Sequence, residues 1–289
     1  MAIESSAFGK FTFYDCGAFG MFAPQSERWQ PNNHGKPTRW LHQYFHTPRP
    51  AIDPETNRIW QEIRQVVRPL GSGTTILDVG AYIGTFCLPA ALCARAEGID
   101  VRIHSFEPGP TDRILAINID LNGLGDVITL HNAALTDFEG YTIYSFTEGG
   151  SIGGNVFQTP GETTQERIVP ARTLDTITRD LPDPLFIKLD TQGHEPRIFN
   201  GAKALVAAKR ACWRIEFLKW SGQTKLGEET FAQMLMREFH VIEGGRPLPD
   251  MAAMDALLEE VDTRPARMTD LVLIPKDAPF TDRVLAAFA

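Results

Sequence analysis

From residue 74 onward, short apolar runs alternate with stretches in which apolar residues recur at helical spacing. The runs have the length of strands and are bounded by glycine, proline or polar residues, which favours buried strands. The expected strands are residues 75–79, 101–106, 127–131, 185–189, 213–217, 239–242 and 271–274. The expected helices are residues 85–96, 111–122, 195–208, 231–237 and 251–261. Repeated strand–helix–strand units predict one α/β sandwich whose seven-stranded, mostly parallel sheet has helices on both faces.

One segment departs from this alternation. Residues 141–146 alternate apolar and polar side chains as an antiparallel strand does, and residues 166–169 follow after the glycine-rich residues 149–154. Two such runs joined by a glycine-rich connection predict a β-hairpin inserted beside the main sheet.

The first 70 residues have a different character, with many aromatic residues, several prolines and no sustained periodicity. Only residues 54–70 show helical spacing, which predicts a helix leading into the sheet. We therefore divide the chain into an N-terminal extension, residues 1–70, and one domain, residues 71–289. Three interpretations of the extension stay open: a cap over the domain, a dimerisation arm, or an irregular leader. The aromatic residues most relevant to them are Trp29, Trp40, Tyr44 and Phe45.

The composition and charge of the chain limit the cellular compartment and the binding partners that we expect. The chain has 289 residues, 43% of them hydrophobic, and 28 Lys and Arg against 36 Asp and Glu, which gives a formal net charge of −8. No apolar run approaches the roughly 20 residues of a membrane helix, and residues 1–11 lack the basic start and apolar stretch of a signal peptide. We therefore expect a cytoplasmic protein with no membrane partner. The acidic balance argues against a nucleic-acid partner.

The four cysteines are too few and too scattered for a disulfide framework. They are Cys16, Cys87, Cys93 and Cys212, and none belongs to a C-x-x-C pair, which argues against a zinc site. Cys87 and Cys93 lie in the apolar stretch of an expected helix, so we interpret both as small buried side chains.

The first candidate site is the turn at residues 78–84, which contains Asp78, Gly80, Tyr82 and Gly84. Here a buried strand ends in a glycine turn that opens a helix, the position where open α/β sheets bind ligands. Glycines allow a ligand to approach the backbone, and a helix N-terminus offers free N–H groups. The spacing is G-x-x-x-G and lacks the first pair of the dinucleotide fingerprint G-x-G-x-x-G. A tight turn without a ligand is the alternative.

The second candidate is Glu107, at the end of the second expected strand. An acidic residue there can accept hydrogen bonds from both hydroxyls of a ribose. The alternative is a solvated acid at a strand end.

The third candidate is the pair Asp190 and His194, which follows the fourth expected strand. Asp190 lies at the open end of that strand, and His194 opens a helix whose first turn holds Pro196. A helix N-terminus disfavours the protonated imidazole, and a neutral imidazole can act as a general base. In the alternative interpretation, His194 and Glu195 only cap the helix.

Six short motifs resemble those of the FkbM-type methyltransferases and follow one another along the chain in the same order as in that family. Residues 78–84, DVGAYIG, resemble the family's DVGANIG, and residues 187–195, IKLDTQGHE, resemble its IKIDVEGxE. The other four motifs are FEP at 106–108, NAALTDFEG at 132–140, TLD at 173–175 and RIEF at 214–217. Two residues depart from the family pattern: Tyr82 stands where Asn is usual, and Gln192 stands where Glu is usual.

This resemblance implies a Rossmann-like class I methyltransferase sandwich that uses S-adenosyl-L-methionine (SAM). It also implies methyl transfer to a hydroxyl of a small molecule, a sugar or a secondary metabolite. The expected cofactor contacts are Asp78, Gly80, Tyr82 and Gly84 at the methionine end, Glu107 at the ribose, and Asn132 and Ala133 at the adenine. Asp190 and His194 would face the acceptor.

The ordinary pKa of a carboxylate is about 4 and that of an imidazole about 6.5, which favours His194 as the base, with Asp190 positioning the hydroxyl. No dedicated metal cluster is visible, so no metal site is predicted, but a divalent metal bound through Asp190 stays open. A homodimer stays open as well. Two other functions stay open: a nicotinamide-dependent oxidoreductase, and a catalytically silent scaffold of the same fold that binds a partner protein.

Overall fold

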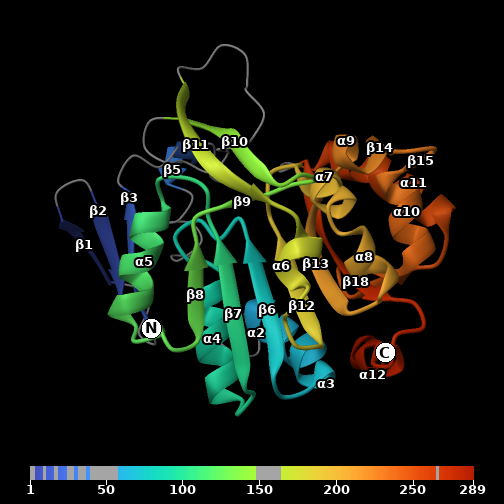
Figure 1. Ribbon diagram of the computed structural model, residues 1–289, viewed down its shortest axis with the longest axis horizontal. Coiled ribbons are helices and arrows are strands. Elements are labelled where there is room, and N and C mark those ends of the chain that lie inside the picture. The colour runs from blue at the N-terminus through green and yellow to red at the C-terminus, as the bar shows by residue number, and fades with distance from the viewer. Residues whose placement is uncertain are drawn as a thin grey trace.

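The centre of the computed structural model is a sheet of eight strands with helices on both faces (Figure 1). The structure describes residues 4–8, 11–15, 19–24, 29–31, 37–39, 58–147, 164–264 and 267–289. The sheet strands are β6 (Thr74–Val79), β7 (Val101–Phe106), β8 (Ile128–His131), β12 (Leu185–Leu189), β13 (Ala211–Leu218), β16 (Phe239–Glu243), β17 (Arg246–Leu248) and β18 (Met268–Pro275). Each of the seven expected strands overlaps one of these, which confirms the predicted α/β sandwich. The eighth is the three-residue β17 at the outer edge.

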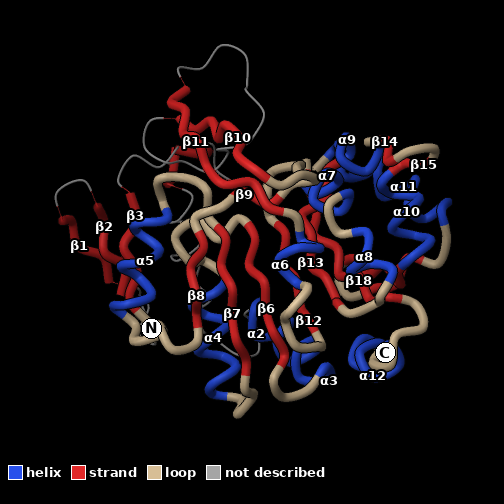
Figure 2. The backbone as a smooth tube through the Cα atoms, in the orientation of Figure 1, coloured by secondary structure: helices blue, strands red, loops and turns tan. Residues whose placement is uncertain are grey.

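The strand order reverses in the middle of the sheet. The spatial order is β17-β16-β18-β13-β12-β6-β7-β8. β6 pairs in parallel with β7 on one side and with β12 on the other, and β18 is antiparallel to both β13 and β16. In such sheets a crevice opens beyond the carboxyl ends of the two strands at the reversal, which here are β6 and β12. The loops that leave these strands gather at that end (Figure 2).

Two hydrophobic cores lie on opposite faces of the sheet, because successive side chains of a strand point to opposite faces. Ile76 of β6 belongs to the first core, whereas Leu77 and Val79 belong to the second. The first core packs against α2 (Arg58–Glu62), η1 (Ile63–Val67), α3 (Arg68–Leu70), α4 (Cys87–Ala96), α5 (Asp112–Leu121) and α12 (Thr281–Leu285). The second core packs against α6 (Leu174–Thr178), α7 (Glu195–Asn200), α8 (Lys203–Ala207), α10 (Phe231–Glu238) and α11 (Met251–Thr263). Cys87 and Cys93 are fully buried in the first core, as expected.

The helix expected over residues 195–208 is interrupted, which corrects the prediction. α7 ends at Asn200 and α8 begins at Lys203. A Cβ on Gly201 would lie 2.2 Å from the carbonyl oxygen of Thr136, so the loop that contains Thr136 packs directly on the break between the two helices. The carboxylate of Asp175 then accepts hydrogen bonds from the N–H groups of Ala204 (3.0 Å) and Leu205 (2.9 Å) and caps α8. The aspartate of the TLD motif thus has a structural role.

The expected hairpin is present as β10 (Gly140–Thr147) and β11 (Thr164–Arg172), which pair antiparallel. β11 also pairs with the two-residue β9 (Ala134–Leu135), and this attaches the hairpin to the loop after β8. The hairpin stands above the carboxyl ends of β6, β7 and β8 (Figure 1). The glycine-rich residues 149–154 lie outside the described residues.

Between residues 4 and 39, the described part of the N-terminal extension forms strands, which were not predicted, whereas residues 58–70 are helical, as expected, and form α2, η1 and α3. β1 (Glu4–Phe8), β2 (Phe11–Asp15) and β3 (Gly20–Pro24) form an antiparallel sheet, and β4 (Trp29–Pro31) pairs with β5 (Pro37–Arg39). β3 lies along α5, where the side-chain carbonyls of Asn118 and Asn122 accept the backbone N–H groups of Phe22 (2.7 Å) and Gly20 (2.9 Å). Trp40, Tyr44 and Phe45 lie outside the described residues, so the role of the extension as a cap or a dimerisation arm stays a prediction.

No helix within the described ranges is long and apolar enough to cross a membrane.

Candidate active site

The glycine turn after β6 packs directly on the residue that follows β12. Gly80 has a φ of +76°, and a Cβ there would lie 2.0 Å from the carbonyl oxygen of Asp190. Gly84 has a φ of +99°, and its Cβ would lie 2.9 Å from atoms of Leu88 and Leu115. Only glycine adopts such angles readily and leaves room for this contact. The two predicted segments therefore meet at the point of strand reversal.

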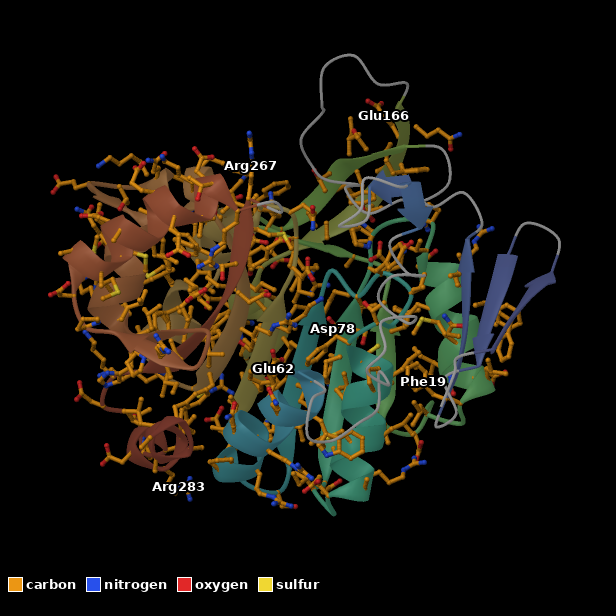
Figure 3. The ribbon with its side chains drawn as sticks, turned by 180° about the vertical axis from the view of Figure 1, so that it is seen from behind. Phe19, Glu62, Asp78, Glu166, Arg267 and Arg283 are labelled. Atoms are coloured by element: carbon orange, nitrogen blue, oxygen red, sulfur yellow. The ribbon has the colours of Figure 1, made fainter. Side chains whose placement is uncertain are left out.

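A buried ion pair lies beneath this turn. Nζ of Lys188 is 3.1 Å from Oδ1 of Asp78 and 3.6 Å from Oδ2 of Asp190, and it donates to the carbonyl oxygen of Gly80 at 3.1 Å. Asp78 is fully buried among the central strands (Figure 3). Burial alone would lower the pKa of Lys188, but the carboxylates of Asp78 and Asp190 outweigh it and raise the pKa above its ordinary value. Lys188 therefore holds both strand ends together, a role that was not predicted.

Glu107 lies at the carboxyl end of β7, as predicted, and is 5% exposed. Its Oε2 accepts a hydrogen bond from the N–H of Tyr82 and its Oε1 accepts one from the N–H of Gly109, both at 2.7 Å. Burial raises the pKa of this carboxyl to about 7, although the two backbone hydrogen bonds oppose the rise. The carboxyl group thus links the turn after β6 to the loop after β7.

The loop after β8 joins the same network. The side-chain amide of Asn132 donates to the carbonyl oxygen of Glu107 at 3.1 Å and to Oδ2 of Asp112 at 2.6 Å. Ala133 is 8% exposed and belongs to the second core. Asn132 and Glu107 therefore lie together, as expected of two residues that bind one ligand.

His194 lies at the start of α7 but is 2% exposed. Its Nε2 is 3.1 Å from the hydroxyl of Thr136. Burial and, to a smaller extent, the nearby Arg197 lower the pKa of His194 to about 4, although Asp137 opposes both. The imidazole is thus neutral at pH 7, as predicted, but the main cause is burial. A base has to reach the hydroxyl that it deprotonates, so this burial weighs against His194 as the base.

Asp190 is the more accessible of the two predicted acceptor-side residues, because its side chain is 40% exposed. The side-chain amide of Gln192 donates to Oδ1 of Asp190 at 3.4 Å and to Oε1 of Glu216 at 3.2 Å. Burial raises the pKa of Glu216 to about 9, with further contributions from Asp190, Glu195 and Asp270. Gln192 therefore bridges the part-exposed side chain of Asp190 and the buried carboxyl of Glu216, whose raised pKa favours its protonated form.

Both departures from the family motifs lie at left-handed backbone positions, with φ of +53° at Tyr82 and +57° at Gln192. Side chains with a Cβ adopt this region at a cost of about 1 kcal/mol or more, and asparagine tolerates it best. Tyr82 contributes its backbone N–H to Glu107, and this contact does not depend on the side chain.

The predicted residues thus gather at one end of the sheet, where Asp78 and His194 are almost fully buried. Within the described ranges, no group of three or more His, Cys, Asp or Glu side chains is arranged to hold a metal ion.

Arg167 and Tyr144 of the hairpin also reach the loop after β7, and neither was predicted. Lys188 was detectable in principle, because a lysine in the middle of an apolar strand requires a buried acidic partner.

Comparisons with known proteins add to this geometry. Residues 78–264 match the family model of the methyltransferase FkbM domain. No curated protein matches the chain. Among solved structures, the chain is similar to an FkbM methyltransferase from Methylobacillus flagellatus, with 17% identity and a TM-score of 0.43. That match covers 70% of this chain and 43% of the other, so this chain spans less than half the length of that relative.

Two further similar structures have other substrates in their descriptions. A precorrin-6y C5,15-methyltransferase from Geobacter metallireducens is 14% identical with a TM-score of 0.36, and the match covers 65% of this chain and 75% of the other. An rRNA methylase from Streptococcus thermophilus is 10% identical with a TM-score of 0.39, and the match covers 73% and 93%.

The family model spans more than half of the chain and runs from the end of β6, through the hairpin, to the end of α11. It therefore includes every predicted site residue. This chain belongs to the methyltransferase FkbM domain family.

Proposed function

We propose that this protein is a cytoplasmic, SAM-dependent O-methyltransferase whose acceptor is a hydroxyl group of a sugar or secondary metabolite. The observation that carries the proposal is the position of Glu107 at the carboxyl end of β7, bonded to the glycine turn after β6. An acidic residue at this position suits a ribose, and the adjacent strand reversal is the usual ligand site of such sheets.

The residues at this end fit a cofactor that contains adenosine. Each oxygen of Glu107 accepts one backbone hydrogen bond, and the hydroxyl of Thr111 also contacts the carboxyl group. A carboxylate offers about four acceptor sites, so ribose hydroxyls can still donate to it. Gly80 and Gly84 would let the methionine end approach the turn, and Asn132 and Ala133 would border the adenine. When bound, SAM supplies a methyl group activated by a sulfonium centre.

On the acceptor side, we propose that Asp190 binds the hydroxyl and takes its proton. Its carboxylate is part-exposed, it lies next to the glycine turn, and Lys188 and Gln192 hold it on the buried side. A fixed carboxylate can orient the attacking oxygen and remove the proton that the reaction releases.

Trp220 supports an acceptor that contains a ring. It follows β13 in α9 (Lys219–Gln223) and is 50% exposed. A Cβ on Gly193 would lie 1.9 Å from Cζ2 of Trp220, so the indole rests on the turn that carries Asp190 and Gln192. An exposed indole beside a carboxylate offers an apolar platform and a hydrogen-bond acceptor, the two features that bind a hydroxylated ring.

The first test is calorimetry with SAM and its product S-adenosylhomocysteine (SAH). Loss of two hydrogen bonds to a charged group leads us to expect that Glu107→Ala weakens binding by about 2–4 kcal/mol. The exposed Glu228→Ala is the matched control and should bind as the wild type does. Unchanged SAH affinity in a folded Glu107→Ala protein would remove Glu107 from the cofactor site.

A second prediction concerns pH. We expect SAH affinity to fall as the pH drops below about 7, because protonated Glu107 accepts fewer hydrogen bonds. Below that pKa, each pH unit costs up to about tenfold in affinity. Glu107→Gln should remove this dependence, and calorimetry between about pH 5.5 and pH 8 measures both proteins. Wild-type affinity that does not change over this range would contradict the prediction.

The same experiments separate the alternatives. Family membership favours methyl transfer over hydride transfer, and an oxidoreductase would be stabilised thermally by NADH rather than SAM. A silent scaffold would bind no SAM, or would bind it without turnover. A screen of hydroxylated sugars, polyketides and phenols for SAH production would identify the acceptor, and the mass of the protein in solution would test for a homodimer.

A further inference from the structure

The β10–β11 hairpin has one face directed at the predicted cofactor loops. Tyr144 and Arg167 are cross-strand partners, and side chains of directly opposed residues project from the same face of a two-stranded ribbon. Tyr141, Ile143 and Ile168 are 75%, 52% and 74% exposed. The hairpin is therefore a projection whose polar contacts with the domain are concentrated on one side.

Arg167 connects the two loops that follow β7 and β8. Its Nη1 lies 3.3 Å from both the carbonyl oxygen of Gly109 and Oδ2 of Asp112, and its Nη2 donates to Oδ1 of Asn132 at 3.2 Å. Asn132 in turn donates to the carbonyl oxygen of Glu107. One guanidinium thus fixes the backbone and side chains on which the proposed ribose and adenine contacts depend. Planar, bidentate contacts of this kind require arginine.

Tyr144 lies beside the carboxyl group of Glu107. A Cβ on Gly109 would lie 2.7 Å from Oε1 of Glu107 and 3.0 Å from Cε1 of Tyr144, so the tyrosine ring and the carboxyl group flank the same residue. Burial raises the pKa of Tyr144 well above its ordinary value, and the negative charge of Glu107 adds to this rise. The hydroxyl therefore keeps its proton and can donate.

We propose that the hairpin is a clasp for the adenosine half of the cofactor, with Arg167 as a positioning residue for Asn132 and Asp112 and Tyr144 as the cover of the ribose pocket. This inference rests on the proposed use of SAM. It extends that proposal by assigning a cofactor role to an insertion outside the sheet.

Calorimetry with two probes tests the clasp. SAH carries the adenosine and the amino acid, whereas 5′-methylthioadenosine carries the adenosine with a methylthio group and lacks the amino acid. We expect Arg167→Met to weaken both by the same factor, about tenfold, because hydrogen bonds to charged groups are lost. Arg167→Lys should recover part of the affinity, since lysine keeps the charge and loses the planar fork. Tyr144→Phe should weaken both probes by a smaller factor.

Arg172→Met is the matched control. Arg172 lies on the same strand and pairs through its backbone with Leu135, but its side-chain Nε contacts Glu139 at 2.8 Å. We expect wild-type affinity from this variant. Amide hydrogen exchange in the protein without ligand provides a second readout, because Arg167→Met should increase exchange in residues 107–112 and 131–133 and Arg172→Met should not.

The possible outcomes separate the two proposals. If the wild type binds SAH and Arg167→Met binds it equally well, the clasp is overturned and the proposed function stands. If Arg167→Met weakens SAH but not 5′-methylthioadenosine, the role of Arg167 lies at the amino-acid end and the clasp is again wrong. If the wild type binds neither probe, both proposals fail.

Discussion

Asp190→Asn should lower the kcat for methyl transfer by about 10²–10⁴-fold, the range usual for the loss of general acid–base catalysis. The substitution keeps the shape of the side chain and removes its ability to take a proton. Because the side chain is part-exposed and lies outside the proposed cofactor contacts, SAH affinity should stay within about twofold of the wild type. The measurement is SAH production with an acceptor found by the screen, together with calorimetry. A kcat near the wild-type value would move the base elsewhere.

His194→Asn provides the contrast. If His194 were the base, as its position in the sequence predicts, this variant would lose turnover as Asp190→Asn does. The burial of His194 against Thr136 leads us instead to expect a loss of stability with kcat largely retained. Thermal unfolding and kcat, measured on the same protein, separate the two cases.

The pH dependence of stability gives an independent check on His194. Burial depresses the pKa of His194 to about 4 in the folded protein, below the value of about 6.5 in an unfolded chain. The unfolded chain therefore binds the proton first, and the contribution of His194 to stability is lost as the pH falls from about 6.5 towards 4. His194→Asn should lack this component of acid destabilisation.

The sheet was predictable because its strands carry strong local signals. Residues 185–189 are apolar in four of five positions, and the run is buried on both faces, as a central parallel strand requires. The glycine turn after β6 was equally visible, because two glycines mark it in the sequence. Both adopt positive φ in the structure, which explains why glycine stands there. The three-residue β17 was not predicted, because its Arg-Pro-Leu sequence carries no strand pattern.

Side-chain partners were harder to predict, because they depend on register. Lys188 and Asp78 are opposed only because β12 and β6 pair in one particular register. Arg167 reaches the loops after β7 and β8 only in the observed register of the hairpin, and a shift by one residue would turn it to the other face. The burial of His194 depends on packing against Thr136, 58 positions away in the chain. Contacts over such separations leave no pattern in the local sequence.

Lys188→Met should destabilise the fold by about 3–5 kcal/mol, since it leaves a buried carboxylate without its cation. Asp78 is fully buried, and Lys188 is its ionic partner at 3.1 Å as well as a donor to the carbonyl oxygen of Gly80. Urea unfolding at pH 7 measures the change in the free energy of unfolding. Lys203→Met, at an exposed position of α8, is the control and should change it by about 0.5 kcal/mol or less.

The double variant Asp78→Leu with Lys188→Met gives the sharper result. Replacement of a whole buried ion pair by apolar side chains is often nearly neutral, whereas removal of one partner is costly. We therefore expect the double variant to be more stable than Lys188→Met alone, with a coupling energy of about 1–3 kcal/mol. Additive losses would show that the two side chains act independently. The Asp78–Lys188 pair joins the ends of β6 and β12. Additive losses would therefore also show that this ion pair is not what holds the glycine turn against Asp190.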